Sequence, residues 1–457
     1  MLASTNSGLA GGHGVKRWVV ILLVALAMLV LLSPGIIGRM AEQGLEDNIA
    51  LARVESPEIT ISTENFARGW FTSEGRHRIE LSDRSAFPEL ATFVNEAGYS
   101  GMPALILDSR IDHGLVPLAS MNRDGGSLQP GIARMATSLQ LDPGSGELID
   151  LPGRMYSTIG LSGSADVVLV VGEGNWADGD TTIGWQGADL LLTMDHAGFI
   201  TSIAGFVAPI RFSAGNRIVT SERIDVTAEQ SKTNYDFRVG SLHVQSQGMS
   251  VTDPFGGGFG YSSIEARARS DIDDDKLSGA TTLDINGLGV PAFGTFDIGL
   301  DVAYRGFDAE SFTRLYRAFE KTASQGRPED AFAALYPSMD SELRQFLAAG
   351  AELRFDRLNI SLPQGDVIAD FVFSLPESGT GDAFSWPGLL LKLKATINLT
   401  VSTEIMEIVL ELQPEAGMMV AMGFLVLQGD EYKMNLEYAQ GLATVNGVPM
   451  PVPMPGT

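Results

Sequence analysis

Two Asp-His pairs are the nearest approach in this sequence to a catalytic proton relay. Asp112 precedes His113, and Asp195 precedes His196. The five histidines are otherwise scattered, and no HxH or HExxH spacing would place two imidazoles on one metal ion. No nucleophile motif accompanies either pair, so we interpret both histidines as surface or turn residues.

Other motifs with the right residue types lack the spacing that their chemistry needs. Asp271, Asp273 and Asp275 resemble the start of a calcium loop, but the sixth and twelfth positions are Lys276 and Thr282 instead of Gly and Glu. We therefore expect an acidic, solvated turn. We predict no enzyme activity, no cofactor and no metal, although a hydrolase with a site assembled from distant residues stays an alternative.

The most unusual short stretch is FARGWFTS, residues 66–73. If it forms a strand, Phe66, Arg68 and Trp70 share a face, and Gly69 clears space on the other side. These four residues are candidates for binding. The alternative is an aromatic corner of the core in which Arg68 stacks on Trp70.

Composition excludes several classes of function. The chain has 457 residues, 44% of them apolar, no cysteine and a net charge of −25. Such an acidic protein is repelled by nucleic acid, so we predict no nucleic-acid partner. Without cysteine it has neither disulfides nor thiolate metal sites.

Residues 18–37 (WVVILLVALAMLVLLSPGII) are apolar enough to span a bilayer core of about 30 Å. Lys16 and Arg17 precede them, and basic flanks tend to stay cytoplasmic. We expect residues 1–17 in the cytoplasm, a transmembrane anchor at 18–37 and an exported body. A cleaved signal peptide is the alternative.

After Pro57 the sequence alternates apolar and polar residues, as strands with one dry face do. The longest run is 391–402, in which Leu393, Ile397 and Leu399 should form the centre of an apolar wall. The sequence therefore predicts a mainly β (α+β) protein of long antiparallel sheets. We name these three residues as further candidates for binding.

A few helices should interrupt the strands near 308–349. Residues 308–321 have apolar residues at helical spacing after Asp308, a candidate N-cap, and 328–349 also fit a helix. Shorter helices are expected at 38–52 and 88–97. We predict a β-rich periplasmic region at 38–305, a helical insert at 306–350 and a C-terminal β-rich region at 351–457, with an extended Pro-rich tail after Val448.

Two stretches carry a family resemblance. FARGWFTSEGRHRIEL (66–81), following the anchor, and GFLVLQGDEYKMNLEYAQGLATVNGVPMPVP (423–453) resemble the beginning and the end of the YdgA-like family of bacterial envelope proteins. That resemblance implies a single-pass inner-membrane protein with its bulk in the periplasm. It supplies no catalytic residues.

Two hypotheses follow for the function. An apolar face on a long sheet must be covered, and a lipid or another apolar ligand in a sheet groove would do so. The alternative is a structural or assembly factor that contacts other envelope proteins or forms a homodimer.

Overall fold

The computed structural model describes residues 59–81, 103–114, 131–144, 147–235, 237–252, 258–290, 294–323, 340–348, 350–377, 388, 391–413 and 415–451. The predicted anchor at 18–37 and the predicted helices at 38–52 and 88–97 lie outside these residues. Within them the protein is mainly β, as the alternation predicts, and the strand pairs are antiparallel.

The chain forms two compact units. The first comprises Met1–Trp176 and Gln186–Ile200, and the second comprises Ala177–Trp185 and Thr201–Thr457. Strand β7, Gly174–Asp178, contains the division.

The first unit is an antiparallel sheet in the order β1-β2-β3-β4-β5-β6-β9. Its strands are β1 Ile59–Arg68, β2 Thr72–Leu81, β3 Ala104–His113, β4 Ala133–Asp142, β5 Ile149–Ile159, β6 Ala165–Val171 and β9 Ala188–Met194. Sequence neighbours pair with one another up to β6, so most connections are hairpins.

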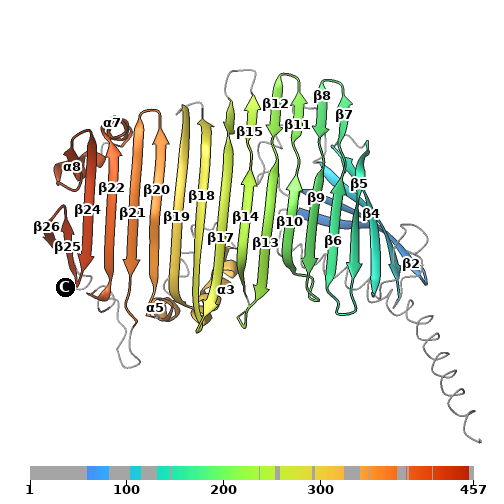
Figure 1. Ribbon diagram of the computed structural model, residues 1–457, viewed down its shortest axis with the longest axis horizontal. Helices are drawn as coiled ribbons and strands as arrows, with labels where there is room; N and C mark the ends of the chain where they lie inside the picture. The colour runs from blue at the N-terminus through green and yellow to red at the C-terminus, as the bar shows by residue number, and fades with distance from the viewer. Residues whose placement is uncertain are drawn as a thin grey trace, which may run out of the picture. The chain divides into compact units, whose positions relative to one another are not determined.

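In the second unit a long antiparallel series runs β10-β13-β14-β17-β18-β19-β20-β21-β22-β24-β25-β26 (Figure 1). A second series, β8-β11-β12-β15-β16, joins it at β18, and β23 pairs with β24. The strands are β8 Thr181–Trp185, β10 Ile200–Val207, β11 Ile210–Ala214, β12 Arg217–Ser221, β13 Ile224–Lys232, β14 Arg238–Ser246, β15 Met249–Thr252, β16 Phe259–Tyr261, β17 Ser263–Asp273, β18 Lys276–Val290, β19 Gly294–Asp308, β20 Glu352–Leu362, β21 Gly365–Ser374, β22 Lys394–Ser402, β23 Val426–Gln428, β24 Glu431–Ala439, β25 Leu442–Val445 and β26 Val448–Pro451.

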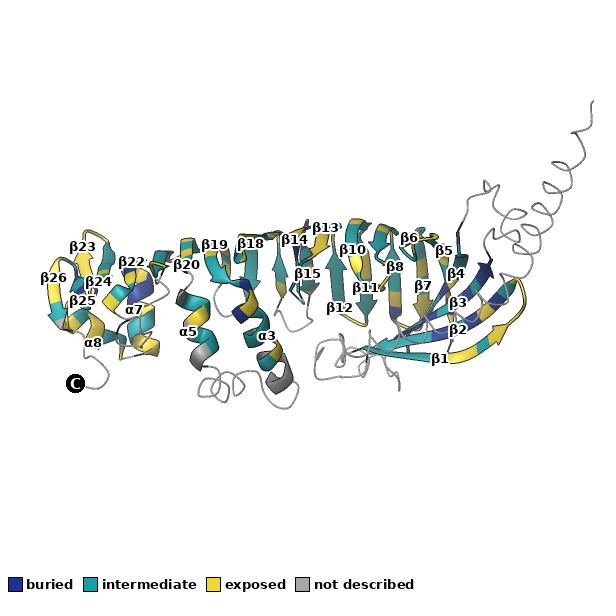
Figure 2. Ribbon diagram, turned by 90° about the horizontal axis from the view of Figure 1, so that it is seen from below, coloured by how far each residue is buried: buried dark blue, intermediate teal, exposed yellow. Residues whose placement is uncertain are grey.

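The helices of the second unit lie on the same side of its sheet (Figure 2). They are α3 Ala309–Ala323, α5 Asp340–Ala348, α7 Thr403–Leu412 and α8 Ala416–Ala421. The predicted N-cap is confirmed, because Asp308 Oδ1 accepts a hydrogen bond from the Ser311 amide at 2.7 Å. Helices α3 and α5 occupy the predicted helical insert, but β19 pairs directly with β20, so the insert interrupts the sheet without dividing it.

The predicted strand at 391–402 is shorter than its alternation indicates. Leu391 and Lys392 are helical, and β22 begins at Lys394, so the expectation that Leu393 lies in this strand is wrong. The pairing register explains why β22 begins at Lys394: this residue pairs with Ser374, the last residue of β21, so residues before it have no partner on that strand. The expected acidic turn is confirmed, since Asp274 and Asp275 are exposed and have the positive φ of a tight hairpin between β17 and β18.

Candidate functional site

One face of the second unit's sheet is apolar over many strands. Because side chains alternate along a strand, residues that are paired in register across the sheet share a face. One such row crosses β13 to β24 and contains only apolar residues: Val226, Val244, Ala266, Leu283, Leu300, Leu358, Ala369, Leu399 and Met434. We call this side of the sheet the apolar face.

The protein itself buries little of the apolar face. Among the described residues of β10 to β18, the buried apolar residues are Val239 and Leu277, and Val239 follows the opposite alternation from Leu242 and Val244, so it lies on the other face. The row from Val226 to Met434 is about 40 Å long at roughly 4.8 Å per strand. Monomers rarely leave so large an apolar surface in contact with water, and surfaces of this kind usually mark binding sites.

Helices cover parts of the apolar face. Ile405 and Met406 of α7 pack with Val401 and Leu425 in a buried cluster, and Leu399 lies against it. Near the other ends of the strands, Phe307 stacks on Phe346 of α5, with ring centroids 4.5 Å apart. The main helix contacts with the long strand series are those of α3 and α5 with β19 and of α7 with β21, β22 and β24. Helix α3 also reaches the start of β14, where Phe312 packs edge-to-face on Phe237 with ring centroids 5.2 Å apart. Beyond these contacts, the row residues Val226, Val244 and Leu283 are half-buried.

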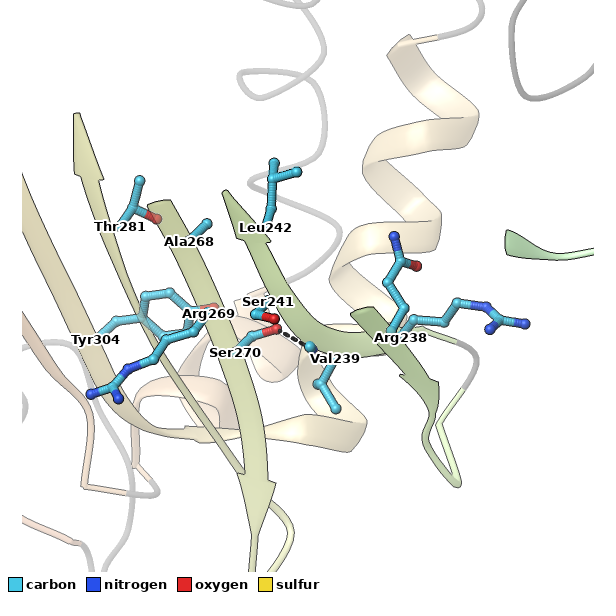
Figure 3. Close-up of a pocket in the computed structure, with 11 residues that line it drawn as sticks. Arg238, Val239, Ser241, Leu242, Ala268, Arg269, Ser270, Thr281 and Tyr304 are labelled. Atoms are coloured by element: carbon cyan, nitrogen blue, oxygen red, sulfur yellow. Dashed lines mark hydrogen bonds between the residues drawn. The ribbon is translucent and has the colours of Figure 1, made fainter. Parts of the chain in front are cut away.

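A pocket of about 260 Å³ lies where small residues from neighbouring strands come into register (Figure 3). Gly240 pairs with Ser270, whose partner on β18 is Gly279, and the ring of Tyr304 lies over Gly279. A Cβ at Gly279 would be only 2.5 Å from the Tyr304 hydroxyl.

Apolar and polar groups both line this pocket. Leu242 and Ala268 belong to the apolar face and form part of the lining. The Ser270 hydroxyl accepts a hydrogen bond from the Gly240 amide at 3.2 Å, and burial raises the pKa of Tyr304. The pocket can therefore hold an apolar group beside a few hydroxyls. Sequence reasoning missed it, because its small residues lie on separate strands and meet only through pairing.

The opposite face of the same strands is polar and charged. Arg357 donates to Asp301 through Nε at 2.8 Å and pairs with Asp284 at 2.7 Å. Hydrogen bonds to Asp301 and then Asp284 raise the pKa of Arg357, so its charge is fixed. The two faces therefore differ in chemistry: the charged face is suited to contact with water, and the apolar face is suited to contact with an apolar group.

The predicted wall residues divide between the sheet and its surroundings. Ile397 and Leu399 lie on the apolar face, in register with Phe371 and Ala369 of β21. Leu393 precedes β22 and is not part of that strand.

The FARGW stretch forms a hairpin and its turn rather than one strand. β1 ends at Arg68, the Gly69 amide donates to the Thr72 carbonyl at 2.8 Å, and β2 begins at Thr72. Trp70 is 54% exposed, so the predicted core corner is wrong. A turn needs no apolar interior, and Gly69 is required there because a Cβ would lie 2.5 Å from the Thr72 carbonyl oxygen. Phe66 is paired with Gly75 at the end of this hairpin.

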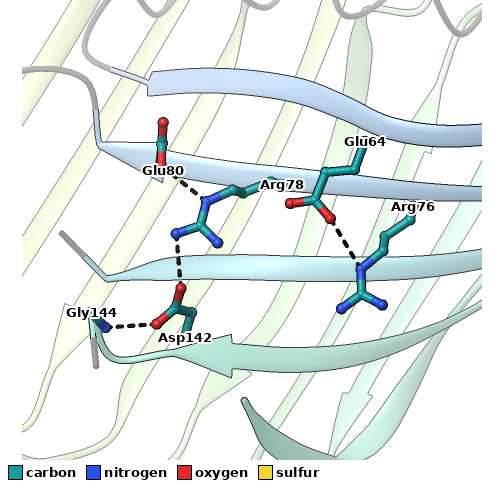
Figure 4. Close-up of polar contacts among 6 residues, drawn as sticks. All are labelled: Glu64, Arg76, Arg78, Glu80, Asp142 and Gly144. Atoms are coloured by element: carbon teal, nitrogen blue, oxygen red, sulfur yellow. Dashed lines mark hydrogen bonds and ion pairs between the residues drawn. The ribbon is translucent and has the colours of Figure 1, made fainter. Parts of the chain in front are cut away.

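The first unit has an ion-pair network on one face of β1 to β4 (Figure 4). Arg78 contacts Glu80 at 3.1 Å and Asp142 at 2.9 Å, and Asp142 also accepts from the Gly144 amide. Arg76 contacts Glu64 at 3.2 Å. Each of these arginines is paired with at least one carboxylate, so we interpret the network as one that stabilises the sheet.

The histidines of the first unit are more buried than expected. His113 lies in β3 and its Nε2 is 3.2 Å from the Ser73 hydroxyl, so its assignment to a surface or turn is wrong. His77 is also buried, with Nδ1 3.1 Å from the Thr63 hydroxyl. Asp112 and His113 are consecutive residues of β3, so their side chains point to opposite faces of the sheet and do not form a proton relay. His196, in contrast, is exposed in a turn.

No group of three His, Asp or Glu residues that could hold a metal ion occurs in the described part of the chain. No helix there has the length and apolar character to cross a membrane.

These features define a class: a β protein whose second unit is an antiparallel sheet with one apolar and one charged face. Residues 16–453 match the family described as "bacterial protein of unknown function", DUF945. The chain belongs to this family. No curated protein and no solved structure matches it. The YdgA-like resemblance and the membrane anchor stay predictions.

Proposed function

We propose that this protein binds the hydrocarbon chains of lipids along the apolar face of its second unit. The observation that carries the proposal is the apolar row in register from Val226 to Met434 on strands that the protein's own helices cover only in part. Covering this row would remove a large apolar area from water, at about 25 cal/mol per Å².

Hydrocarbon fits this face better than a peptide does. A peptide laid across it would lose the water that solvates its amides, and the face offers few polar groups in return. Each unpaired amide group would cost about 1–3 kcal/mol. An acyl chain has no such groups and can follow the side chains from strand to strand.

The cellular setting is part of the proposal. Residues 18–37 would anchor the chain in a bacterial inner membrane and Lys16–Arg17 would keep its first residues inside, with the body in the periplasm. Lipids would then be available at the membrane, and the role would be non-enzymatic envelope maintenance.

Native mass spectrometry of the full-length chain tests the proposal with two matched variants. Leu242 and Ile368 are both exposed apolar strand residues, 42% and 48%, but Leu242 lies on the apolar face and Ile368 on the opposite face. We expect wild type to retain adducts of lipid mass. Leu242→Asp should reduce them several-fold, and Ile368→Asp should leave them unchanged.

Two outcomes would contradict the proposal. If Leu242→Asp and Ile368→Asp retain equal amounts of lipid adduct, lipid does not bind at the apolar face. A lipid-free dimer that Leu242→Asp dissociates would show that a second copy covers the face, as the assembly hypothesis expects. Circular dichroism of each variant checks that the sheet is intact.

A further inference from the structure

A second apolar surface lies on the outer side of α7, α8 and β23. Leu412, Met418 and Met422 are 70%, 60% and 59% exposed. Ile408, Met419 and Leu427 are also exposed, and we call these six residues the methionine patch. Their elements share one buried cluster, built from residues such as Ile405, Val420 and Leu425, so their outer sides adjoin.

The apolar arc of α7 is wider than folding requires. At about 100° per residue, Ile405, Met406 and Val409 point toward the buried cluster, which satisfies the one stripe that a surface helix needs. Ile408 and Leu412, one helical turn apart, extend the arc onto exposed surface. Folding does not explain these two residues, but a partner would.

The surroundings of the patch are mostly acidic, although Lys433, which pairs with Val426 across β23 and β24, forms an ion pair with Glu431 at 2.8 Å. No Lys or Arg occurs between Lys394 and Lys433. Of the acidic residues in this stretch, Glu431 is half-buried and the others are exposed: Glu404, Glu407, Glu411, Glu415 and Asp430. Flexible methionine side chains adapt to different apolar partners, and flanking carboxylates select basic ones.

We propose that the methionine patch docks a basic amphipathic helix of a partner protein. The helix would place its apolar face on Leu412, Met418 and Met422 and its Lys or Arg residues beside the flanking carboxylates. A second copy of this chain fits poorly, because a symmetric contact would oppose the same carboxylates. An anionic lipid surface is repelled for the same reason.

The test uses the full-length chain in zwitterionic nanodiscs, with empty nanodiscs as the blank. The probe is a labelled helical peptide of Leu and Lys with one apolar face, and binding is read as fluorescence anisotropy. We expect binding that weakens with salt, and no binding of the matched Leu and Glu peptide. Leu412→Gln with Met418→Gln should weaken the Lys peptide at least tenfold. The control, Leu442→Gln, changes an equally exposed leucine outside the patch and should have no effect.

Three results would overturn the docking proposal. These are no binding of the Lys peptide, equal binding of the Glu peptide, and binding by the patch variant as tight as that by Leu442→Gln. Each leaves the lipid proposal untouched, because lipid adducts are measured separately and depend on Leu242.

Discussion

At the scale of single residues, His77 should make the stability of the first unit depend on pH. The imidazole is buried on β2, with the Thr63 hydroxyl at Nδ1 and no hydrogen-bond partner for Nε2 within the described residues. Burial lowers the pKa of His77 below its ordinary value of 6.5. Gly75 makes room for this arrangement, since a Cβ there would be 2.8 Å from Nε2.

Stability should therefore fall as the pH drops below about 6.5 toward the lowered pKa. In that window the unfolded chain binds a proton that the folded chain does not, and each unit of pKa difference is worth about 1.4 kcal/mol. Melting temperatures between pH 5 and 8 measure this loss. His77→Gln should flatten the dependence, while His196→Gln, at an exposed turn, should not change it. Identical profiles for wild type and His77→Gln would show that another group is responsible.

At the scale of elements, β22 shows what alternation can and cannot predict. Its two faces follow from the sequence, because Ile397 and Leu399 alternate with Thr396 and Thr400. The residue at which β22 begins cannot be predicted from the alternation, because it is set by the residue at which its partner β21 ends. The pocket beside Tyr304 was equally unpredictable, since Gly240, Ser270 and Gly279 are far apart in sequence and adjacent only through register.

The two faces of β22 should respond differently to a buried charge. Leu399 packs against the α7 cluster, so Leu399→Asp places an unpaired carboxylate on an apolar interface and should destabilise the protein by about 3 kcal/mol or more. Thr400→Asp, one residue later on the polar face, should cost less than about 0.5 kcal/mol. Urea unfolding followed by circular dichroism compares the two. Similar losses would mean that both faces of this strand are covered.

At the scale of the whole molecule, the sequence predicted the fold class and missed local exposure. Long alternating runs fix antiparallel strands because every residue contributes to the pattern. The exposure of Trp70 depends on a turn that Gly69 permits, and no periodicity marks a turn of that kind in advance. Likewise, an alternating strand has a dry face by pattern, but only the three-dimensional arrangement reveals that much of that face is left open.

The most direct test of lipid binding is photo-cross-linking of the full-length chain in growing bacteria. A photoreactive phenylalanine analogue replaces Phe371 on the apolar face or Ile368 on the opposite face of the same strand. We expect lipid to be attached at position 371 and not at 368, which is read as a mass shift of the purified chain. Lipid at both positions, or only protein at 371, would contradict it.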